Sequence, residues 1–524
     1  MAETEQGVSA EVEELGVTTA KKSIVYVGGD VISSVLTVLM LIFLARYLQP
    51  SLFGIYSIVI AFSTLLNVGS NFGIGTAFRK MLPELKITDS ERLHRLLSNG
   101  YFIALCLGLV IAVIGVLISG LLAVDVYGNA AMTLPLQLAA VAEFLAVVYN
   151  LTLAALTGLG MVKYATFSNV TYGASGLFFT VALVLLGYGV LGALIGYVIG
   201  FILSALVGIF YLVRATGFRP KRRDKATVKE LSSFSAPVVA SYVAQYGAQS
   251  FAVLFLGVFV VSSVVGNYGS AYKLARIIEL LITDATFILL PAFAKALSSE
   301  SIAHKIGAIY NNSIYYSALV LLPIVAYAIS AATPLANVLL GSAYTTAPFY
   351  FSVMIIGMTV SIIGAYAGTL IIGHGDTKRF LKYQLIAIIV QLLLVVVLTP
   401  YLQAIGVLLA LFVITPIILD AIYIVALEEQ FKFRHTFGKL IRITIAAVIT
   451  WMALYGMAIV IGASSKWLLI TNAVVALLLF PPLVVLLGGI EKKNLDFIKK
   501  TGERLSPAKP FVDAIVRYTA FFVR

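Results

Sequence analysis

About fourteen long apolar stretches divide this sequence, and its basic residues are confined to alternate gaps between them. All but four of the 36 Lys and Arg residues lie in every second gap. Basic residues stay on the cytoplasmic side when a chain is threaded through a bilayer. The alternation therefore predicts a chain that crosses a membrane about fourteen times, with both termini in the cytoplasm.

Composition leads to the same class of protein. Of the 524 residues, 60% are hydrophobic and only 11% are charged, too few to cover a water-facing surface. A membrane β-barrel would show strands of about ten residues with alternating polarity. Stretches such as 24–47 and 443–461 instead stay apolar over the length that a spanning helix needs. We predict an all-α polytopic membrane protein in the cytoplasmic membrane of the cell.

The apolar stretches give the approximate bounds of the predicted spans. They are residues 24–47, 53–78, 98–123, 132–157, 165–187, 190–213, 235–260, 267–294, 307–330, 347–372, 381–399, 403–427, 443–463 and 466–489.

Charge and hydropathy also divide the chain into six segments. They are a disordered acidic cytoplasmic tail (1–20), an N-terminal lobe of spans one to six (21–213), a flexible basic cytoplasmic linker (214–234), a C-terminal lobe of spans seven to twelve (235–427), two further spans (443–489) and a basic amphipathic tail (490–524). The last segment is typical of helices that lie on the inner membrane surface.

An internal repeat supports the division into two lobes. Gly54 opens span two and Gly158 follows span four, while Gly266 opens span eight and Gly373 follows span ten at nearly the same separation. Because each lobe holds an even number of spans, the copies share one orientation and form a parallel repeat. Such halves typically rock around a central cavity, which indicates a transporter; a duplication without a transport role is the alternative.

The repeated Gly-x-Gly-x-x-Lys pattern after spans four and ten has a structural explanation. A phosphate-binding loop of this kind needs a preceding strand and a following helix. Here the pattern falls between two helices, where glycine supplies a left-handed helix cap and lysine anchors the span at the headgroups. The basic gaps likewise indicate topology and attraction to anionic membrane lipids, so we expect no nucleic-acid partner. Cys106 is the only cysteine, which excludes a disulfide and a thiolate metal cluster.

Span eight breaks the charge pattern and carries the predicted substrate site. A charged side chain deep in a membrane is retained mainly where it faces a cavity or a partner. At 100° per residue the polar residues of this span share one broad helical face, with cations suited to phosphate and aromatic rings suited to sugar. An internal salt bridge between Arg276 and Glu279 is the alternative. The residues of this face are Tyr268, Tyr272, Lys273, Arg276, Glu279 and Asp284.

Isolated acids in the first lobe have two open interpretations. Asp30 in span one and Glu143 in span four could bind H⁺ or Na⁺ that drives transport, or could balance the charge of Lys273 and Arg276. We extend the same choice to Glu279 and Asp284. Near the cytoplasmic end of span twelve, Asp420 fits a residue that snorkels or packs between helices. The neutral amides Asn67, Asn71, Gln245 and Gln249 add hydrogen bonds in the same space or serve interhelical packing alone. Asn169 attracts notice only as part of a glycosylation sequon, which we attribute to chance.

Two ordered motifs resemble a known family. The run from Ala45 to Tyr56, Ala-Arg-Tyr-Leu-Gln-Pro-Ser-Leu-Phe-Gly-Ile-Tyr, is similar to the junction of spans one and two in polysaccharide-unit flippases of the O-antigen type. The run from Val265 to Leu274 is similar to their span-eight signature. These flippases belong to the multidrug/oligosaccharidyl-lipid/polysaccharide exporter superfamily. The lipid II flippases of that superfamily match less well, since they use several arginines in spans one and two.

The resemblance implies a function. Such a protein flips an oligosaccharide linked to a polyprenyl or dolichyl (pyro)phosphate from the cytoplasmic to the outer leaflet by alternating access, alongside glycosyltransferases of the same pathway. A cation-coupled multidrug exporter of the same superfamily is the alternative, although such proteins resemble twelve-span bundles and lack the spans at 443–489. A membrane glycosyltransferase would need an outer loop rich in acidic or metal-binding residues, so we expect no enzyme and no metal or organic cofactor.

Overall fold

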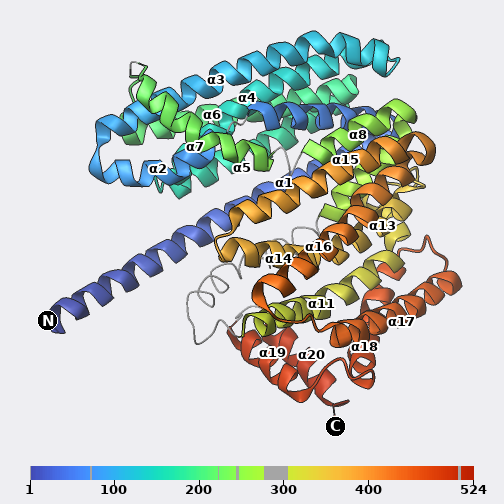
Figure 1. Cartoon of the computed structure of the whole chain (residues 1–524). Coiled ribbons are helices and arrows are strands. Elements are labelled where there is room, and N and C mark those ends of the chain that lie inside the picture. Colours follow the sequence, from blue (N-terminus) through green and yellow to red (C-terminus); the bar gives the residue numbers. More distant parts are fainter. Residues whose placement is uncertain are drawn as a thin grey trace. The chain divides into compact units, whose positions relative to one another are not determined.

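A computed structural model describes residues 2–70, 73–221, 223–242, 247–276, 305–504 and 509–523. These residues form helices joined by short turns, so the predicted all-α class is confirmed for this part of the chain (Figure 1). The chain divides into two compact units, Met1–Gly266 and Asn267–Arg524, and each is described by itself.

Unit 1 contains eight α-helices within its described residues. They are α1 (Ala2–Ser70), α2 (Ile74–Thr88), α3 (Ser90–Leu121), α4 (Thr133–Gly158), α5 (Val162–Leu183), α6 (Gly189–Thr216), α7 (Lys225–Tyr242) and α8 (Ala248–Phe259). Short π-helical turns at Leu122–Val126 (η1) and Val184–Tyr188 (η3) follow α3 and α5. A further helix over 262–276 begins in unit 1 and continues into unit 2.

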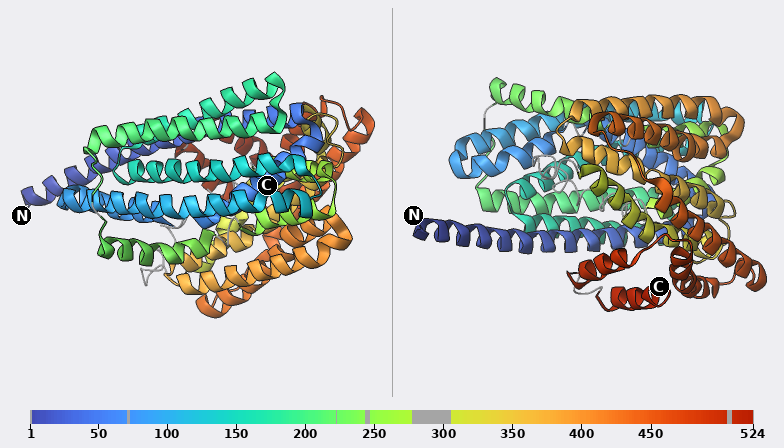
Figure 2. Two further views of the ribbon diagram at one scale, coloured as in Figure 1. Left: turned by 90° about the horizontal axis from the view of Figure 1, so that it is seen from above. Right: turned by 60° about the horizontal axis from the view of Figure 1, so that its bottom comes forward.

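Unit 2 is also helical wherever it is described. Its helices are α11 (Ile306–Ser330), α12 (Ala332–Leu339), α13 (Ala347–Val360), α14 (Ile362–Gly373), α15 (Thr377–Leu408), the π-helical η5 (Leu409–Ile414), α16 (Thr415–Phe431), α17 (Phe437–Ile461), α18 (Leu468–Leu486), α19 (Lys492–Arg504) and α20 (Lys509–Ala520). The last two pack against each other, and α20 packs on α18 (Figure 2).

The predicted spans correspond closely to these helices. By length and composition, nine helical segments of the described chain are able to cross a membrane. Three of them contain a residue with positive φ, Gln49 at 58°, Gly187 at 93° and Gln403 at 52°, where helical geometry is interrupted. Divided at these breaks, the nine segments match twelve of the predicted spans, and the protein is a multi-pass membrane protein.

Spans seven and eight are described only in part. The seventh, predicted at 235–260, coincides with the end of α7 and with α8, and the eighth, predicted at 267–294, is described only to Arg276. The total of fourteen therefore remains a prediction.

The compact units do not meet at the predicted linker. We expected a flexible hinge at 214–234, but α7 begins at Lys225 inside it. Asp224 starts this helix: its carboxylate accepts hydrogen bonds from Thr227 Oγ1 (2.6 Å) and from the backbone of Ala226 (3.1 Å). The helix then packs on α2 and α3, while α8 packs on α1. Both helices consequently belong to unit 1, and the boundary of the units falls after Gly266.

The N-terminal segment is continuous with the first span, since α1 begins at Ala2. The disorder predicted for residues 1–20 stays a prediction. The segment contains no proline, and its Glu and Ala residues favour a helix. Helical structure therefore extends outward from the apolar stretch.

Within unit 1, the repeated motif glycines permit a very close backbone approach. A Cβ atom on Gly54 would lie 1.7 Å from the carbonyl oxygen of Ser262, and one on Gly266 would lie 1.9 Å from the carbonyl oxygen of Pro50. Each glycine thus faces the carbonyl four residues before the other. Any side chain at either position would collide with backbone, which accounts for glycine in both copies of the motif.

Candidate functional site

Glu143 on α4 lies in a polar site prepared for a carboxylate. Its side chain is buried, with 5% of its surface exposed. Ser63 donates a hydrogen bond to Oε1 at 2.5 Å, and Asn67 donates one to Oε2 at 2.7 Å; both donors lie on the second half of α1. Two donors aimed at one carboxylate stabilise its charged form inside the membrane. Of the two residues, Asn67 was expected to make hydrogen bonds between helices, and Ser63 gave no signal in the sequence.

Asp30 on α1 is joined to α5 through Asn169. The Asn169 amide donates to Asp30 Oδ1 at 3.0 Å, and its own oxygen accepts from Tyr149 (2.9 Å) and Ser33 (3.2 Å). Asp30 is exposed, whereas Asn169 and Ser33 are buried. One amide therefore links an accessible carboxylate to hydroxyl groups inside unit 1. In the sequence Asn169 had been noticed only as part of a sequon.

Small residues bring these helices close enough for that link. A Cβ atom on Gly29 would lie 2.0 Å from Thr166 Cγ2, and one on Gly173 would lie 3.1 Å from Ser33 Oγ. The first half of α1 therefore approaches α5 through glycine at two points. On α5, one contact lies before Asn169 in the sequence and the other lies after it. Gly29 directly precedes Asp30, so the local sequence sets the position of the carboxylate.

An aromatic cluster lies beside both acids in unit 1. Tyr149 stacks on Tyr172 with ring centroids 5.2 Å apart, Tyr172 stacks on Phe201 at 5.0 Å, and Phe201 meets Tyr197 edge to face at 4.7 Å. Tyr149 is hydrogen-bonded to Asn169, and Tyr197 lies in the neighbourhood of Glu143. The cluster thus connects the surroundings of the two carboxylates through α4, α5 and α6.

The helix over 262–276 carries the predicted cationic residues. Lys273 is half-buried and Arg276 is exposed, and the two positive charges are close enough to repel each other. Two cations three residues apart face the same side of a helix, which is unfavourable unless an anion compensates. This pair is an arrangement that could hold a phosphate group.

The tyrosines of this helix belong to unit 2 and contact other aromatic residues of that unit. Tyr268 has no exposed surface, and its ring centroid lies 6.4 Å from that of Tyr350 on α13. Tyr272 is half-buried, 6.3 Å from Phe412 in η5. We expected both on a wet face; Tyr268 instead packs inside unit 2, because it falls on the edge of the helix opposite Lys273. Glu279 and Asp284, the remaining residues of the predicted face, lie outside the described residues.

Asn267 has a role that the sequence did not indicate, and Asp420 has one of the two that the sequence left open. Asn267 Oδ1 accepts from the backbone nitrogens of Thr346 (3.1 Å) and Ala347 (3.0 Å), at the start of α13. Asp420 is buried, and its Oδ1 accepts from the nitrogen of Gly364 (2.9 Å) in the first turn of α14. Each side chain satisfies helix N-terminal donors, where a negative charge is also favoured. Asp420 therefore packs between helices and does not snorkel.

Among the residues that the structure describes, no group of three His, Cys, Asp or Glu side chains is placed to hold a metal ion. The arrangement in unit 1 is suited to binding a proton or a monovalent cation at a carboxylate. The arrangement on helix 262–276 is suited to binding an anion.

The chain matches one protein family in sequence and several solved structures in fold. The model of a family described as polysaccharide biosynthesis protein matches residues 19–297. No curated protein matches the chain. Among solved structures, the chain is similar to the lipid II flippase MurJ in an inward closed conformation, with a TM-score of 0.71 and 14% identity over 88% of this chain and 98% of that chain.

Two transporters of the MOP superfamily have related folds. An inward-facing multidrug resistance MATE family transporter gives a TM-score of 0.61 and 15% identity, over 78% of this chain and 98% of that chain. A transporter from Pyrococcus furiosus, described as having a binding pocket of reversed polarity, gives 0.53 and 16% identity, over 79% of this chain and 95% of that chain. At these identities the likeness establishes the fold, which agrees with the superfamily that the motifs indicated.

Proposed function

The chain belongs to the family of polysaccharide biosynthesis proteins, and on that basis we propose that it flips a lipid-linked oligosaccharide across the cytoplasmic membrane. The substrate class is an oligosaccharide on a polyprenyl or dolichyl (pyro)phosphate. It moves from the cytoplasmic to the outer leaflet by alternating access, without covalent chemistry. Glycosyltransferases that build the glycan are the expected partners.

The cationic pair Lys273 and Arg276 is the observation that carries this proposal. Both lie in a predicted span, where an ionised side chain costs about 2.5–3.5 kcal/mol on the translocon scale. A phosphate offers each of them a charge-assisted hydrogen bond, which repays this cost and removes their mutual repulsion. A drug exporter for cationic compounds has no use for such a pair.

Physical chemistry explains why a glycan needs a protein to cross. Each polar group without a partner in hydrocarbon costs several kcal/mol, so a hydrated path must receive the sugar head. The lipid tail needs no such path and can remain in the bilayer. On this proposal Tyr272, half-buried beside Lys273, offers an aromatic plane to the sugar next to the phosphate.

Asp30 and Glu143 are the proposed sites of coupling to H⁺ or Na⁺. Glu143 has donors for both oxygens, and Asp30 is exposed and joined to the interior by Asn169. A cation bound at either acid would change the hydrogen bonds that link α1 to α4 or α5. The inverse role, in which these acids balance Lys273 and Arg276, remains the alternative.

A cation-coupled multidrug exporter is the second candidate, favoured by the buried acid in unit 1 and by the fold shared with a MATE transporter. The last two spans separate the candidates. Here α17 and α18 form complete helices after α16, and the flippase fold covers more of this chain than the exporter fold, 88% against 78%.

Reconstitution in proteoliposomes tests the proposed function. A fluorescent lipid-linked oligosaccharide is incorporated in both leaflets, and its accessibility to an external quencher is followed over time. The wild-type protein should flip it, and Lys273→Gln with Arg276→Gln should slow flipping by about 100-fold or more, since each hydrogen bond to a charged group contributes about 1.5–3 kcal/mol.

A matched control removes two cations elsewhere. Lys378 and Lys382 are exposed and one turn apart at the start of α15, so replacing both with glutamine leaves the transport site intact and should not change the rate. Normal flipping by the Lys273/Arg276 double variant would refute the assignment of the phosphate site. Flipping of a cationic dye but not of the lipid-linked oligosaccharide by the wild type would favour the exporter.

A further inference from the structure

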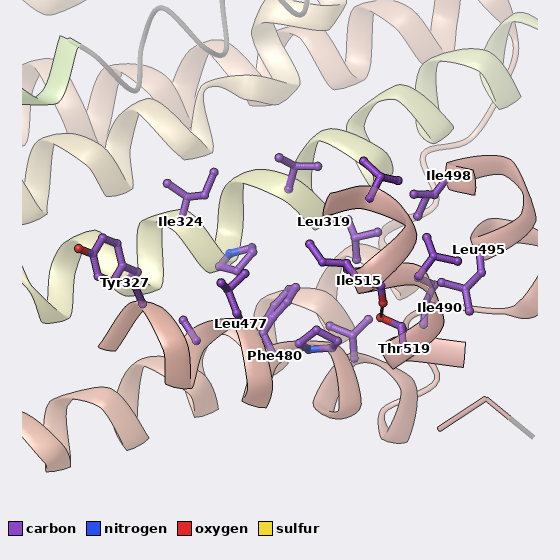
Figure 3. A pocket seen from close by; sticks show the side chains of 18 residues that line it. Leu319, Ile324, Tyr327, Leu477, Phe480, Ile490, Leu495, Ile498, Ile515 and Thr519 are labelled. Atoms are coloured by element: carbon purple, nitrogen blue, oxygen red, sulfur yellow. Dashed lines mark hydrogen bonds between the residues drawn. The ribbon is translucent and has the colours of Figure 1, made fainter. Parts of the chain in front are cut away.

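An apolar cavity of about 540 Å³ lies in unit 2 between α11, α18 and the tail helices α19 and α20 (Figure 3). Side chains from both sides point into it, among them Leu319, Leu477 and Ile515. Only Tyr327 and Thr519 bring a hydroxyl group to its lining. Their hydroxyls already donate to the carbonyl oxygens of Leu469 (3.1 Å) and Ile515 (2.7 Å), so the cavity presents hydrocarbon to a ligand.

The depth of this cavity matches one leaflet of a bilayer. Its lining along α18 runs from Ala473 to Val484, which at 1.5 Å per residue is about 16 Å. The hydrocarbon core of a bilayer is about 30 Å thick, so one leaflet contributes about 15 Å. The cavity ends near Ile490 and the tail, on the side where basic residues predict the cytoplasm. Along α18 the lining therefore matches the depth of the inner leaflet, and Tyr327 extends it toward the start of that helix.

Positive charge gathers at the cytoplasmic end of the cavity. Glu491, next to Ile490, pairs with Lys439 (2.6 Å) and Lys493 (2.7 Å). Arg442 donates to the carbonyl oxygen of Gly488 at 3.0 Å. Two basic side chains thus pair with one carboxylate, a third binds the backbone three residues before it, and Lys493 keeps 74% of its side chain exposed. The surplus charge is available to an anionic headgroup.

We infer that this cavity is a binding site for an anionic phospholipid of the inner leaflet. One acyl chain fills the apolar space, and the phosphate lies among Lys439, Arg442 and Lys493. Anionic lipids are abundant in the cytoplasmic leaflet and are attracted to juxtamembrane basic residues. The site is distinct from the proposed transport site, because its lining includes no residue of helix 262–276, α13, η5 or α16.

The dimensions favour a phospholipid over the carrier lipid of the substrate. The cavity is one leaflet deep, which suits a fatty acyl chain, whereas polyprenyl carriers are several times longer. A glycan would also need hydrogen-bonding groups, and the two hydroxyls of the lining are already engaged. The bound lipid would hold the tail in place together with the stacking of Phe497 on Tyr316.

Native mass spectrometry of the purified full chain tests the site. The protein is exchanged into detergent with equal amounts of palmitoyl-oleoyl phosphatidylglycerol and the phosphatidylcholine of the same chains. The wild-type protein should retain one molecule of phosphatidylglycerol in preference to phosphatidylcholine. Ala476→Trp, which fills the cavity from α18, should abolish retention, whereas Val474→Trp, on the exposed side of the same helix, should not.

A second variant keeps the inference testable if Ala476→Trp fails to fold. Replacing Lys439, Arg442 and Lys493 with glutamine should weaken retention of phosphatidylglycerol by about tenfold or more and remove the preference over phosphatidylcholine, since each basic residue near an anionic surface contributes about fivefold. The control replaces Lys378, Lys382 and Lys432, which are exposed elsewhere in unit 2.

Three results would overturn the inference. They are equal retention of the two lipids by wild type, unchanged retention in both the filled and the uncharged variants, and displacement of phosphatidylglycerol by polyprenyl phosphate at lower concentration. The last would identify the carrier lipid as the occupant. None of these results depends on whether the protein flips a glycan.

Discussion

A buried carboxylate has different hydrogen-bond partners in the two units. In unit 1, both oxygens of Glu143 accept from side chains, Ser63 and Asn67. In unit 2, one oxygen of Asp420 accepts from the backbone of Gly364, and the other has no hydrogen-bond partner among the described residues. The first carboxylate is held by side chains of a neighbouring helix, and the second is a cap for a helix. The two buried carboxylates therefore differ in what satisfies them, side chains of a neighbouring helix in unit 1 and a backbone nitrogen in unit 2.

The largest expected effect comes from removing each carboxylate in turn. Glu143→Leu leaves two buried donors without their acceptor and should destabilise the protein by about 2–6 kcal/mol, whereas Asp420→Leu deprives only the Gly364 nitrogen and should cost about 1–3 kcal/mol. Thermal unfolding in detergent, followed by size-exclusion chromatography, measures both. Equal losses would show that the two sites do not differ as their hydrogen bonds indicate.

A second prediction concerns the glycine that positions Asp30. Gly29→Ala places a Cβ atom against Thr166 and should cost about 1–3 kcal/mol through overpacking. Thr166→Ala should restore most of this loss in the double variant. Gly28→Ala is the matched control, because a Cβ atom there meets nothing within 4 Å. A loss that Thr166→Ala does not relieve would place the strain elsewhere than at the α1–α5 contact.

A third prediction concerns one position at which the two copies of the repeated motif differ. Asn267 in unit 2 caps α13, while the equivalent position in unit 1, after Gly54, is Ile55. Asn267→Ala should therefore cost about 0.5–2 kcal/mol, as loss of a helix cap does. Asn267→Asp keeps the acceptor and should be close to wild type in the same melting experiment. An unfolding temperature of Asn267→Ala equal to that of the wild type would show that the cap does not stabilise the protein.

The smallest effect is expected at the C-terminal tail. Hydrogen bonds from Lys439 and Lys493 lower the pKa of Glu491 from 4.5 to about 2. The stabilisation from these bonds is complete above pH 4.5 and is lost only as the pH falls through about 2, so docking of α19 should not change between pH 8 and 5. Glu491→Gln should speed hydrogen exchange in α19 at both pH values. A change in the hydrogen exchange of α19 in the wild-type protein between pH 8 and 5 would contradict the lowered pKa of Glu491.

The spans could be predicted from the sequence because their signal is local. The stretch 307–330 became α11 (Ile306–Ser330), and 347–372 became α13 and α14, because apolar length and flanking charge are read along the chain. The same local signal located Asp30 and Glu143, since an acid in an apolar stretch is conspicuous. Their partners were harder: Asn169 lies 139 residues from Asp30, and nothing along the sequence indicates that they meet.

One error and one open choice show what the sequence lacks. Tyr268 was assigned to the face of Lys273, although five residues at 100° each separate the two by about 140°, and it packs on Tyr350 instead. For Asp420, the position near the end of span twelve left snorkelling and packing between helices open, and the hydrogen bond from the Gly364 nitrogen at the start of α14 selects packing. Depth and helical phase constrain where a side chain points, and tertiary contacts decide what it meets.

The mutual approach of Gly54 and Gly266 sets a limit on how this protein can be observed. A reporter group attached at either glycine would push the backbones apart and abolish the contact it was meant to record. Labels belong beside the contact, at exposed Ser51 and Val261, after the exposed Cys106 has been replaced so that no other thiol reacts. Spectroscopic distances between those two positions would then register the state of the contact while leaving its atoms untouched.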